Sequence, residues 1–227
     1  MGPLFWLIRL TLITGAVGIL AACNETADPK DNSDALQSIA HIEHPAKDLW
    51  IARCASCHGA DGRGAQDMGA PAINGLPSWY VARQMRHFQE GIRGNHKRDT
   101  QGQAMMAAVA GISTVDITAL IELMGRLPTR LPPRTLNGDL ARGKDYHNNL
   151  CSACHGSDGD GNEALQAPPL NTLNDWYLVA QYEKFRAGIR GAHAQDVYGA
   201  QMLRFAPAVE AEVIPDIAYF ITQASGD

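Results

Sequence analysis

An internal repeat constrains this 227-residue chain more than any other feature of its sequence. The five residues that begin at Cys54 return at Cys151, 97 positions later (151 minus 54), and both copies read Cys-x-x-Cys-His. The same shift aligns, without a gap, a series of identical residues: Gly-Ile-Arg-Gly at 91 to 94 and 188 to 191, His96 and His193, Met105 and Met202. The register then slips by three, so that Asp116 meets Asp216. The chain is therefore two copies of one domain.

Each copy of the motif has the form of a c-type haem attachment sequence. Two thiols on one helical turn reach the two vinyl groups of a porphyrin, and the next residue then lies under the iron. The expected thioether links and proximal ligands are Cys54, Cys57 and His58, with Cys151, Cys154 and His155. The alternatives are a thioredoxin-like redox pair, a zinc site and a structural disulfide. Zinc would need the four cysteines together, whereas the repeat places them in separate domains.

A haem iron used for electron transfer needs a second axial ligand, and methionine is the usual one. Met202 is the only methionine of the second copy, and its counterpart in the first copy is Met105. We expect both in a loop before the last helix of each domain, although a methionine can also simply fill a core. Met106 is the alternative ligand in the first copy. The recurring His96 and His193 leave open a bis-histidine site or a surface role.

The predicted fold class is all-α, because no stretch alternates convincingly as a strand. Helices are expected before each cysteine pair, near residues 80 to 90 and 177 to 187, and at the end of each domain. Prolines at 128, 132 and 133 cannot continue a helix and stiffen the connection between the copies. The predicted units are a first domain over residues 45 to 128, a proline-rich linker over 129 to 136 and a second domain over 137 to 227.

The first 22 residues have the layout of a secretory signal peptide, with Arg9 followed by an uncharged apolar stretch. That stretch is shorter than the roughly 20 residues needed to span a membrane. It ends Leu-Ala-Ala-Cys, which resembles the lipobox of bacterial lipoproteins, so Cys23 is expected to become the lipidated N-terminus. Residues 23 to 44 are mostly small and polar, which predicts a flexible tether. The expected location is the periplasm, with a lipid anchor in the inner or outer membrane.

The charge of the chain is modest overall but uneven. Nineteen Lys and Arg against 24 Asp and Glu give a net charge of −5, which disfavours a nucleic-acid partner. Residues 47 to 134 carry 11 basic and 7 acidic residues, whereas residues 138 to 227 carry 6 and 12. The two domains, of opposite sign, are expected to face different redox partners. The alternative is that these charges only solvate the surface and hold the domains together.

The sequence resembles class I cytochromes c, and specifically the tandem, di-haem cytochrome c-4 type, from about His44 to Gln223. The run Cys-Ala-Ser-Cys-His-Gly-Ala-Asp-Gly-x-Gly at residues 54 to 64, its twin at 151 to 161 and the Phe-x-x-Gly-x-Arg segments at 88 to 93 and 185 to 190 carry the resemblance. It implies two small helical domains, each wrapped around a covalently bound haem c. The region from residue 91 to 105 is also similar to cytochrome c domains attached to some terminal oxidases.

The resemblance also implies roles for residues around each haem. The carbonyl groups of Pro71 and Pro168 are expected to accept hydrogen bonds from the proximal histidines. Further residues are candidates for contacts with the haem propionates, although core packing explains the tryptophans equally well: Trp79, Trp176, Arg93 and Arg190.

These features together predict an electron carrier with no enzymatic activity. An iron with histidine and methionine on its two sides has no open position for a substrate and cycles between Fe(III) and Fe(II). The expected partners are donor and acceptor redox proteins such as cytochromes, an oxidase or a reductase. The alternatives are an electron-transfer subunit of a larger oxidase or dehydrogenase and, from the enzyme class, a di-haem peroxidase or thiosulfate-oxidising cytochrome.

Overall fold

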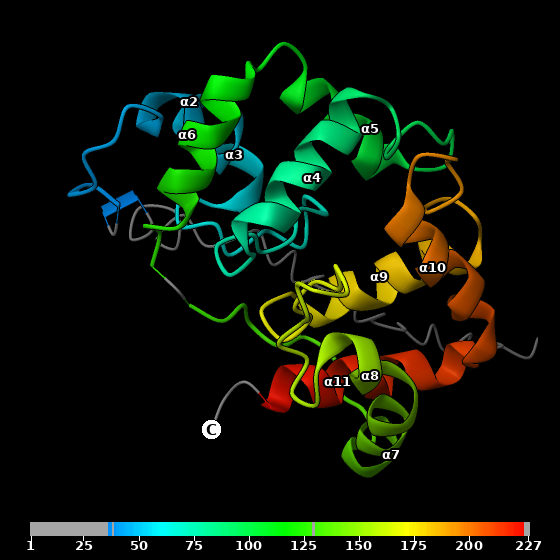
Figure 1. Cartoon of the computed structure of the whole chain (residues 1–227). Coiled ribbons are helices and arrows are strands. Elements are labelled where there is room, and N and C mark those ends of the chain that lie inside the picture. The colour runs from blue at the N-terminus through cyan, green and yellow to red at the C-terminus, as the bar shows by residue number, and fades with distance from the viewer. Residues whose placement is uncertain (1–35, 38, 129, 225–227) are drawn as a thin grey trace, which may run out of the picture.

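The computed structural model describes residues 36 to 37, 39 to 128 and 130 to 224. In these ranges the regular structure is helical, and the extended pairing is limited to two isolated bridges, Ala65 with Ala70 and Asn162 with Ala167. The all-α class is therefore confirmed. Two lobes are stacked on each other and joined by one extended connection (Figure 1).

Five helices of the first lobe are described with their full bounds, and the second lobe repeats them with additions. The helices of the first are α2 (Lys47–Arg53), α3 (Ala55–His58), α4 (Ser78–Gln89), α5 (Thr100–Val109) and α6 (Thr114–Met124). Those of the second are α7 (Leu140–Tyr146), the π-helical η1 (His147–Cys151), α8 (Ser152–His155), α9 (Asp175–Arg186), α10 (Val197–Phe205), the 3-10 turns η2 (Ala206–Ala208) and η3 (Ala211–Val213), and α11 (Ile214–Ala224).

The structure explains the register of the repeat. Helices α4 and α9 begin 97 positions apart, at Ser78 and Asp175, and each has 12 residues. The three-residue slip falls after α10, where the turns η2 and η3 occupy the connection to α11. In the first lobe, only residues 110 to 113 separate α5 from α6.

Each lobe has its own apolar core. In the first lobe, Trp50 on α2 packs with Leu120 and Leu123 on α6, and all three are about 1% exposed. The second core is smaller and gathers around Val209, Val213 and the apolar face of α11. Each lobe therefore has a core of its own, and the core of the first lobe is the larger.

Part of the predicted tether belongs to the first lobe. Ile39 and Ile42 are 3% and 7% exposed and join the first core, and the Lys47 ammonium donates a hydrogen bond to the carbonyl of Ala40 at 2.8 Å. The folded region therefore begins before the predicted boundary at residue 45, because two isoleucines suffice to dock this polar segment. The predicted signal peptide, Cys23, the tether up to residue 35 and residue 38 lie outside the described residues.

The connection between the lobes is held at both ends. The Asn74 amide donates a hydrogen bond to the carbonyl of Pro128 at 2.9 Å. The carboxylate of Asp175, which is 1% exposed, accepts hydrogen bonds from the backbone N–H groups of Thr135 and Leu136 at 2.6 and 2.7 Å. These bonds satisfy a buried charge and tie the linker to the second lobe.

Among the described helices, none is by itself long and apolar enough to cross a membrane. Helices α5 and α6 reach that length and apolarity only when they are taken together, and the chain bends by 112° between them.

Candidate haem sites

Each lobe surrounds a cavity with its Cys-x-x-Cys-His motif in the wall. The first cavity lies between α3, α4, α5 and α6, and its lining includes Cys54, Cys57, His58 and Met105. The second has the corresponding residues Cys151, Cys154, His155 and Met202. The walls are otherwise mainly apolar, which suits a flat, hydrophobic cofactor.

The proximal histidine of the first lobe is oriented by a loop. The Nδ1–H of His58 donates a hydrogen bond to the carbonyl oxygen of Pro71 at 2.8 Å. Because a carbonyl can only accept, Nε2 carries the free lone pair, and it faces the Met105 Sδ at 3.5 Å. Burial lowers the pKa of His58, which keeps the imidazole in the neutral form that a metal needs.

The second lobe repeats this arrangement. The Nδ1–H of His155 donates to the carbonyl oxygen of Pro168 at 2.8 Å, and burial lowers the pKa of His155 as well. Met202 lines the same cavity. The hydrogen bond from the proximal histidine to a proline carbonyl, which the resemblance implied, is thus present once in each lobe.

A glycine brings each proline loop close to its histidine. The Gly64 N–H donates to the carbonyl of His58 at 2.8 Å, and Gly64 has a φ of 84°. A Cβ at this position would lie 2.5 Å from the carbonyl carbon of Pro71, so a larger residue would push away the acceptor that orients the ring.

The methionines lie in helices, not in the loops that the sequence suggested. Met105 is in the middle of α5 and Met202 is in α10. The Asp99 carboxylate accepts a hydrogen bond from the N–H of Gly102, and Asp196 caps α10 through the N–H of Gly199 in the same way. These caps start a helix at a place where the sequence has little apolar periodicity.

The structure distinguishes between the alternative axial ligands. Met105 lines the first cavity, whereas Met106 is absent from the described lining. His96 and His193 also lie outside the lining of both cavities, and their Nδ1 atoms accept hydrogen bonds from the N–H groups of Arg98 and Gln195. The geometry therefore favours Met105 and Met202 over a bis-histidine site.

The cysteines have the properties of attachment residues and not of a reactive pair. All four described cysteines are free thiols, and the described residues contain no group of three or more His, Cys, Asp or Glu suited to a metal ion. Burial raises the pKa of Cys54 and of Cys151 to about 11, so both thiols are protonated at neutral pH. A thioredoxin-like pair requires the opposite shift.

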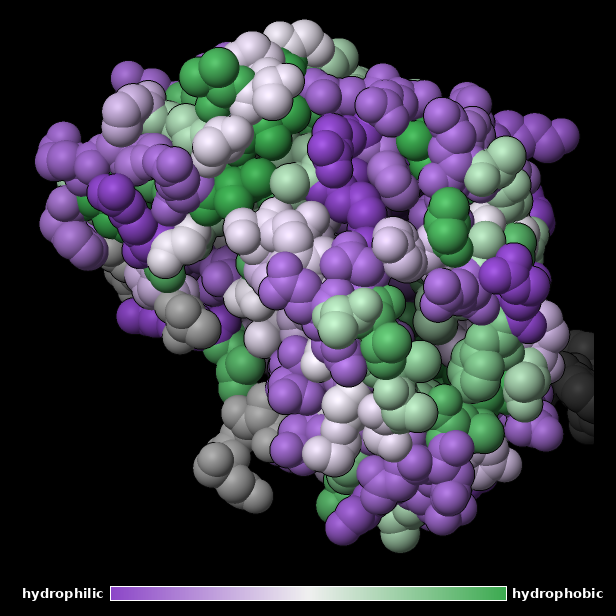
Figure 2. Space-filling model, viewed as in Figure 1, coloured by the Kyte–Doolittle hydropathy of each residue, from purple (hydrophilic) through white to green (hydrophobic). Residues whose placement is uncertain are grey.

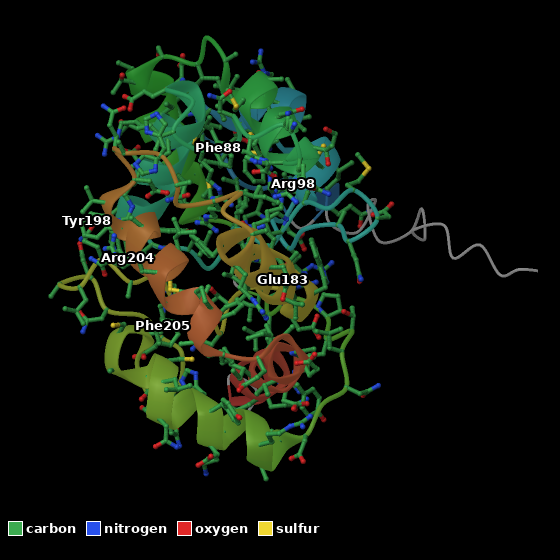
Figure 3. All side chains as sticks on the ribbon, turned by 90° about the vertical axis from the view of Figure 1, so that its right-hand side faces the viewer. Phe88, Arg98, Glu183, Tyr198, Arg204 and Phe205 are labelled. Carbon is green, nitrogen blue, oxygen red and sulfur yellow. The ribbon has the colours of Figure 1, made fainter. Side chains whose placement is uncertain are left out.

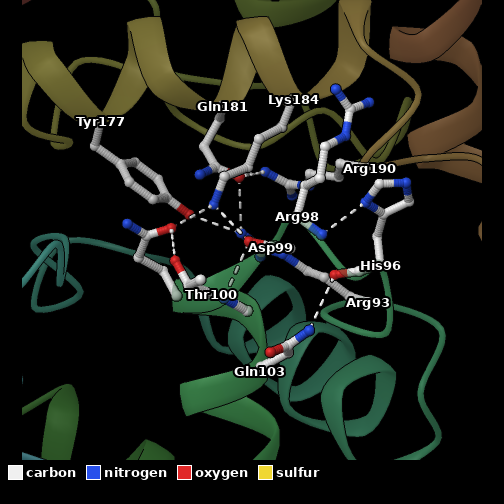
Figure 4. A network of polar contacts seen from close by, with 12 residues as sticks. Arg93, His96, Arg98, Asp99, Thr100, Gln103, Tyr177, Gln181, Lys184 and Arg190 are labelled. Atoms are coloured by element: carbon white, nitrogen blue, oxygen red, sulfur yellow. Dashed lines mark hydrogen bonds and ion pairs between the residues drawn. The ribbon is translucent and has the colours of Figure 1, made fainter.

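The two cavities meet at a polar network between the lobes (Figure 4). The Arg93 guanidinium bonds to Gln84 of its own lobe at 2.6 Å and to the hydroxyl of Tyr177 across the interface at 2.8 Å. Arg190 makes the corresponding contacts in the other direction: its guanidinium donates to the side-chain oxygen of Gln181 at 2.9 Å and to the hydroxyl of Tyr80 at 3.0 Å. Figure 4 draws only some of these contacts. Each arginine lines the cavity of its own lobe.

Trp79 and Trp176 lie outside the lining of both cavities, in contrast to their predicted place near the propionates. Their neighbours Tyr80 and Tyr177 line both cavities. Trp79 instead packs edge-on against Tyr80, with 5.7 Å between ring centroids. Sequence reasoning missed the tyrosines, although the aligned Trp-Tyr pairs were the signal that could have found them.

One ion pair and one histidine–carboxylate contact cross the interface between the lobes. The Lys184 ammonium lies 2.6 Å from the Asp99 carboxylate, and His87 lies 3.8 Å from Asp196. These pairs occupy aligned positions in the repeat and connect the lobes in both directions. For Lys184 and Asp99 the structure favours the interpretation that charge holds the lobes together. Burial lowers the pKa of His87, which favours its neutral form, so its contact with Asp196 does not support that interpretation.

The residues present fit a covalently bound haem. Two thiols, a neutral imidazole and a thioether sulfur lie in the wall of one apolar cavity, and arginines at the interface suit two carboxylates.

On the face shown in Figure 2, apolar residues gather over the second lobe between α8 and α10. Leu150 and Leu165 in the lining of the second cavity are 39% and 47% exposed, so this cavity reaches the surface.

A family model described as cytochrome c matches residues 44–128 and 140–225. The chain therefore belongs to the cytochrome c family and contains two such domains in tandem. Two domains of this kind, each with a Cys-x-x-Cys-His motif, imply two covalently bound haem c groups.

Relatives of known role include electron-transfer proteins. A thiosulfate dehydrogenase electron acceptor from Thiomonas intermedia (strain K12) is 30% identical over 168 residues, which are 69% of this chain and 73% of the relative. A cbb3-type cytochrome c oxidase subunit FixP from Bradyrhizobium diazoefficiens is 30% identical over 186 residues, 78% of this chain and 61% of that protein.

Solved structures confirm the tandem fold. Cytochrome c4 from Acidithiobacillus ferrooxidans superimposes with a TM-score of 0.61 at 22% identity, covering 75% of this chain and 98% of that one. Reduced cytochrome c4 from Pseudomonas stutzeri gives a TM-score of 0.59 at 20% identity, covering 79% and 97%. The prediction of a fold of the cytochrome c4 type is thus confirmed.

Proposed function

We propose that this protein is a membrane-tethered, periplasmic electron carrier whose two haem irons both have histidine and methionine as axial ligands. The observation that carries the ligation is the His58 Nε2 facing the Met105 Sδ at 3.5 Å inside the first cavity. His155 and Met202 share the second cavity. When bound, haem supplies the one-electron Fe(III)/Fe(II) couple, and the chain supplies the axial ligands and excludes water.

Three features support a carrier over an enzyme. Both cavities have the methionine, so neither iron has an open position for substrate. The four cysteines near the cavities are all assigned to thioether links, so no thiolate is left to act as a ligand. Similar proteins include a thiosulfate dehydrogenase electron acceptor and an oxidase subunit, which favours a partner of that class for this chain.

The test of this function is the response of the oxidised and the reduced holoprotein to cyanide and to peroxide. We expect no spectral change on adding either ligand, and we expect both haems to be reoxidised by an acceptor cytochrome. Binding of cyanide by one haem, or turnover of peroxide, would show an open site and favour the di-haem enzyme. Co-purification with a partner from detergent extracts would indicate the alternative role as a subunit of a larger oxidase or dehydrogenase.

The tether part of the proposal rests on the sequence around Cys23. Residue 23 is the only one of the five cysteines outside the two haem motifs, and it follows directly on the uncharged apolar leader. A thioether-linked diacylglycerol has two acyl chains, which is enough for stable membrane anchoring. Residues 24 to 35 would then connect the lipid-bearing cysteine to the part of the chain that the structure describes.

The anchor predicts the chemical state of the mature N-terminus. Trypsin should release residues 23 to 30 as the first peptide, because Lys30 is the first basic residue after Cys23. We expect its mass to include a lipid on Cys23 and to start at that residue. The variant Cys23→Ser should lack this peptide while keeping both haems. An unmodified Cys23, or a mature chain that begins elsewhere, would contradict the anchor.

A further inference from the structure

One contact across the interface breaks the symmetry of the repeat. Arg83 of α4 bonds to Gln166 of the second lobe, with Nη1 2.8 Å from the side-chain oxygen and Nη2 3.1 Å from the backbone carbonyl. The residues at the corresponding repeat positions are Ala180 and Gly69. Neither side of this contact therefore has an equivalent in the other direction.

The backbone of the acceptor adopts a conformation that favours glycine. Gln166 has a φ of 57° and is the only residue other than glycine with a positive φ in the described chain. Its repeat partner Gly69 has nearly the same φ, 63°. A glutamine at this place carries a backbone cost that glycine avoids, and it gains an amide oxygen for Arg83.

The guanidinium of Arg83 is fixed in the wall of the second cavity. Arg83 is 8% exposed and its carbon Cζ lies 5.0 Å from the ring centroid of Trp79 and 4.7 Å from that of Tyr198. Tyr198 is at the start of α10, beside the first lobe (Figure 3). Arg83, Gln166 and Tyr198 all line the second cavity. Cation–π contacts of this kind hold a guanidinium in place without neutralising it.

Part of this guanidinium has no partner in the protein. The Arg83 Nε is buried and makes no hydrogen bond. No described carboxylate forms an ion pair with Arg83. The charge of Asp196 raises the pKa of Arg83 only from a longer distance. Lys184 crosses the interface in the opposite direction and lines the first cavity, but Asp99 pairs with it at 2.6 Å. The second cavity thus receives a cation from the other lobe without a directly paired carboxylate.

We propose that Arg83 of the first lobe is a residue of the second haem site, where its free Nε–H donates to a haem carboxylate and its charge raises the reduction potential of that haem alone. This inference rests on the proposed function, because it requires a haem in the second cavity. A fixed cation nearby disfavours the additional positive charge of Fe(III), and a buried position strengthens the effect. Arg83 is a positioning and tuning residue that leaves the axial ligands unchanged.

The test is a spectroelectrochemical titration of the holoprotein resolved into two one-electron components. Met202→His identifies the component of the second haem, because loss of methionine ligation lowers its potential. In Arg83→Gln we expect the reduction potential of this component to fall by about 59 mV. That shift corresponds to a tenfold change in the ratio of reduced to oxidised haem at a given applied potential. The other component should stay at its wild-type potential.

Three further variants separate tuning from general effects. Arg83→Met is a second neutral variant that keeps the stem against the aromatic rings, and it should give the same shift. Arg83→Lys keeps the charge and should retain most of the wild-type potential. Arg86→Gln removes an exposed arginine from the same helix and should move neither component.

The outcomes separate this inference from the function on which it rests. Equal shifts of both components, or no shift in either neutral variant, would overturn the role of Arg83 while leaving the carrier function intact. Neutral variants that lose the second haem altogether would also overturn it, because Arg83 would then serve assembly and not tuning. A wild-type chain with fewer than two haems would contradict the proposed function itself.

Discussion

Replacing Cys151 and Cys154 by alanine should reduce the covalent haem content from two to one per chain. Both thiols are free and line the cavity that holds His155. Without thioether links, the second haem is held only by its axial ligands and apolar contacts. The pyridine haemochrome method, combined with the mass of the intact chain, measures this loss.

The loss should also destabilise the second lobe more than the first. Among the described residues, the second core has five buried apolar residues, whereas the first has fifteen. We expect the variant to lose the thermal transition of the second lobe and keep that of the first. The mirrored change at Cys54 and Cys57 should also leave one haem, and Ser152→Ala, inside the motif, should leave two. A double-cysteine variant that retains both covalent haems would contradict the attachment sites.

Replacing Met202 by histidine should lower the potential of one haem and leave the other unchanged. Methionine ligation raises the potential of a haem relative to histidine, and protein ligands spread haem potentials over about 0.8 V. We therefore expect a fall on the order of 0.2 V for this exchange of one ligand. A potentiometric titration that follows both haems measures it.

The same variant should lose half of the weak near-infrared band that arises from methionine bound to Fe(III). Met105→His should remove the other half, because Met105 faces His58 in the first cavity. Met106→Leu is the matched control and should alter neither the band nor the potentials, since Met106 lies outside the described cavity lining. A change of ligation in the Met106 variant, with Met105 variants unaffected, would assign the ligand to the other methionine.

Much of the fold and of the site could be predicted from the repeat. The spacing of Cys54, Cys57 and His58 is a local property of one helical turn, so it needs no knowledge of the rest of the fold. Because the motif recurs 97 residues later, the same attachment and ligand residues are predicted for the second lobe. The closing helix α6 was visible because its apolar residues follow the period of a helix.

The parts that sequence reasoning missed depend on packing between distant segments. The helix around Met105 was expected as a loop, because its start depends on a cap by Asp99 and not on apolar periodicity. Tyr80 and Tyr177 became site residues only when the lobes came together. The contact of Arg83 with Gln166 was invisible because both residues depart from the repeat on which the prediction was based.

The most direct test of the central claim is the optical spectrum of the wild-type holoprotein, extended into the near infrared and calibrated by a haemochrome count. The proposed function predicts two covalent haems per chain and a methionine-to-iron(III) band at full strength for both. A single haem, a band of half strength, or high-spin iron that binds cyanide would contradict a carrier in which histidine and methionine ligate both irons.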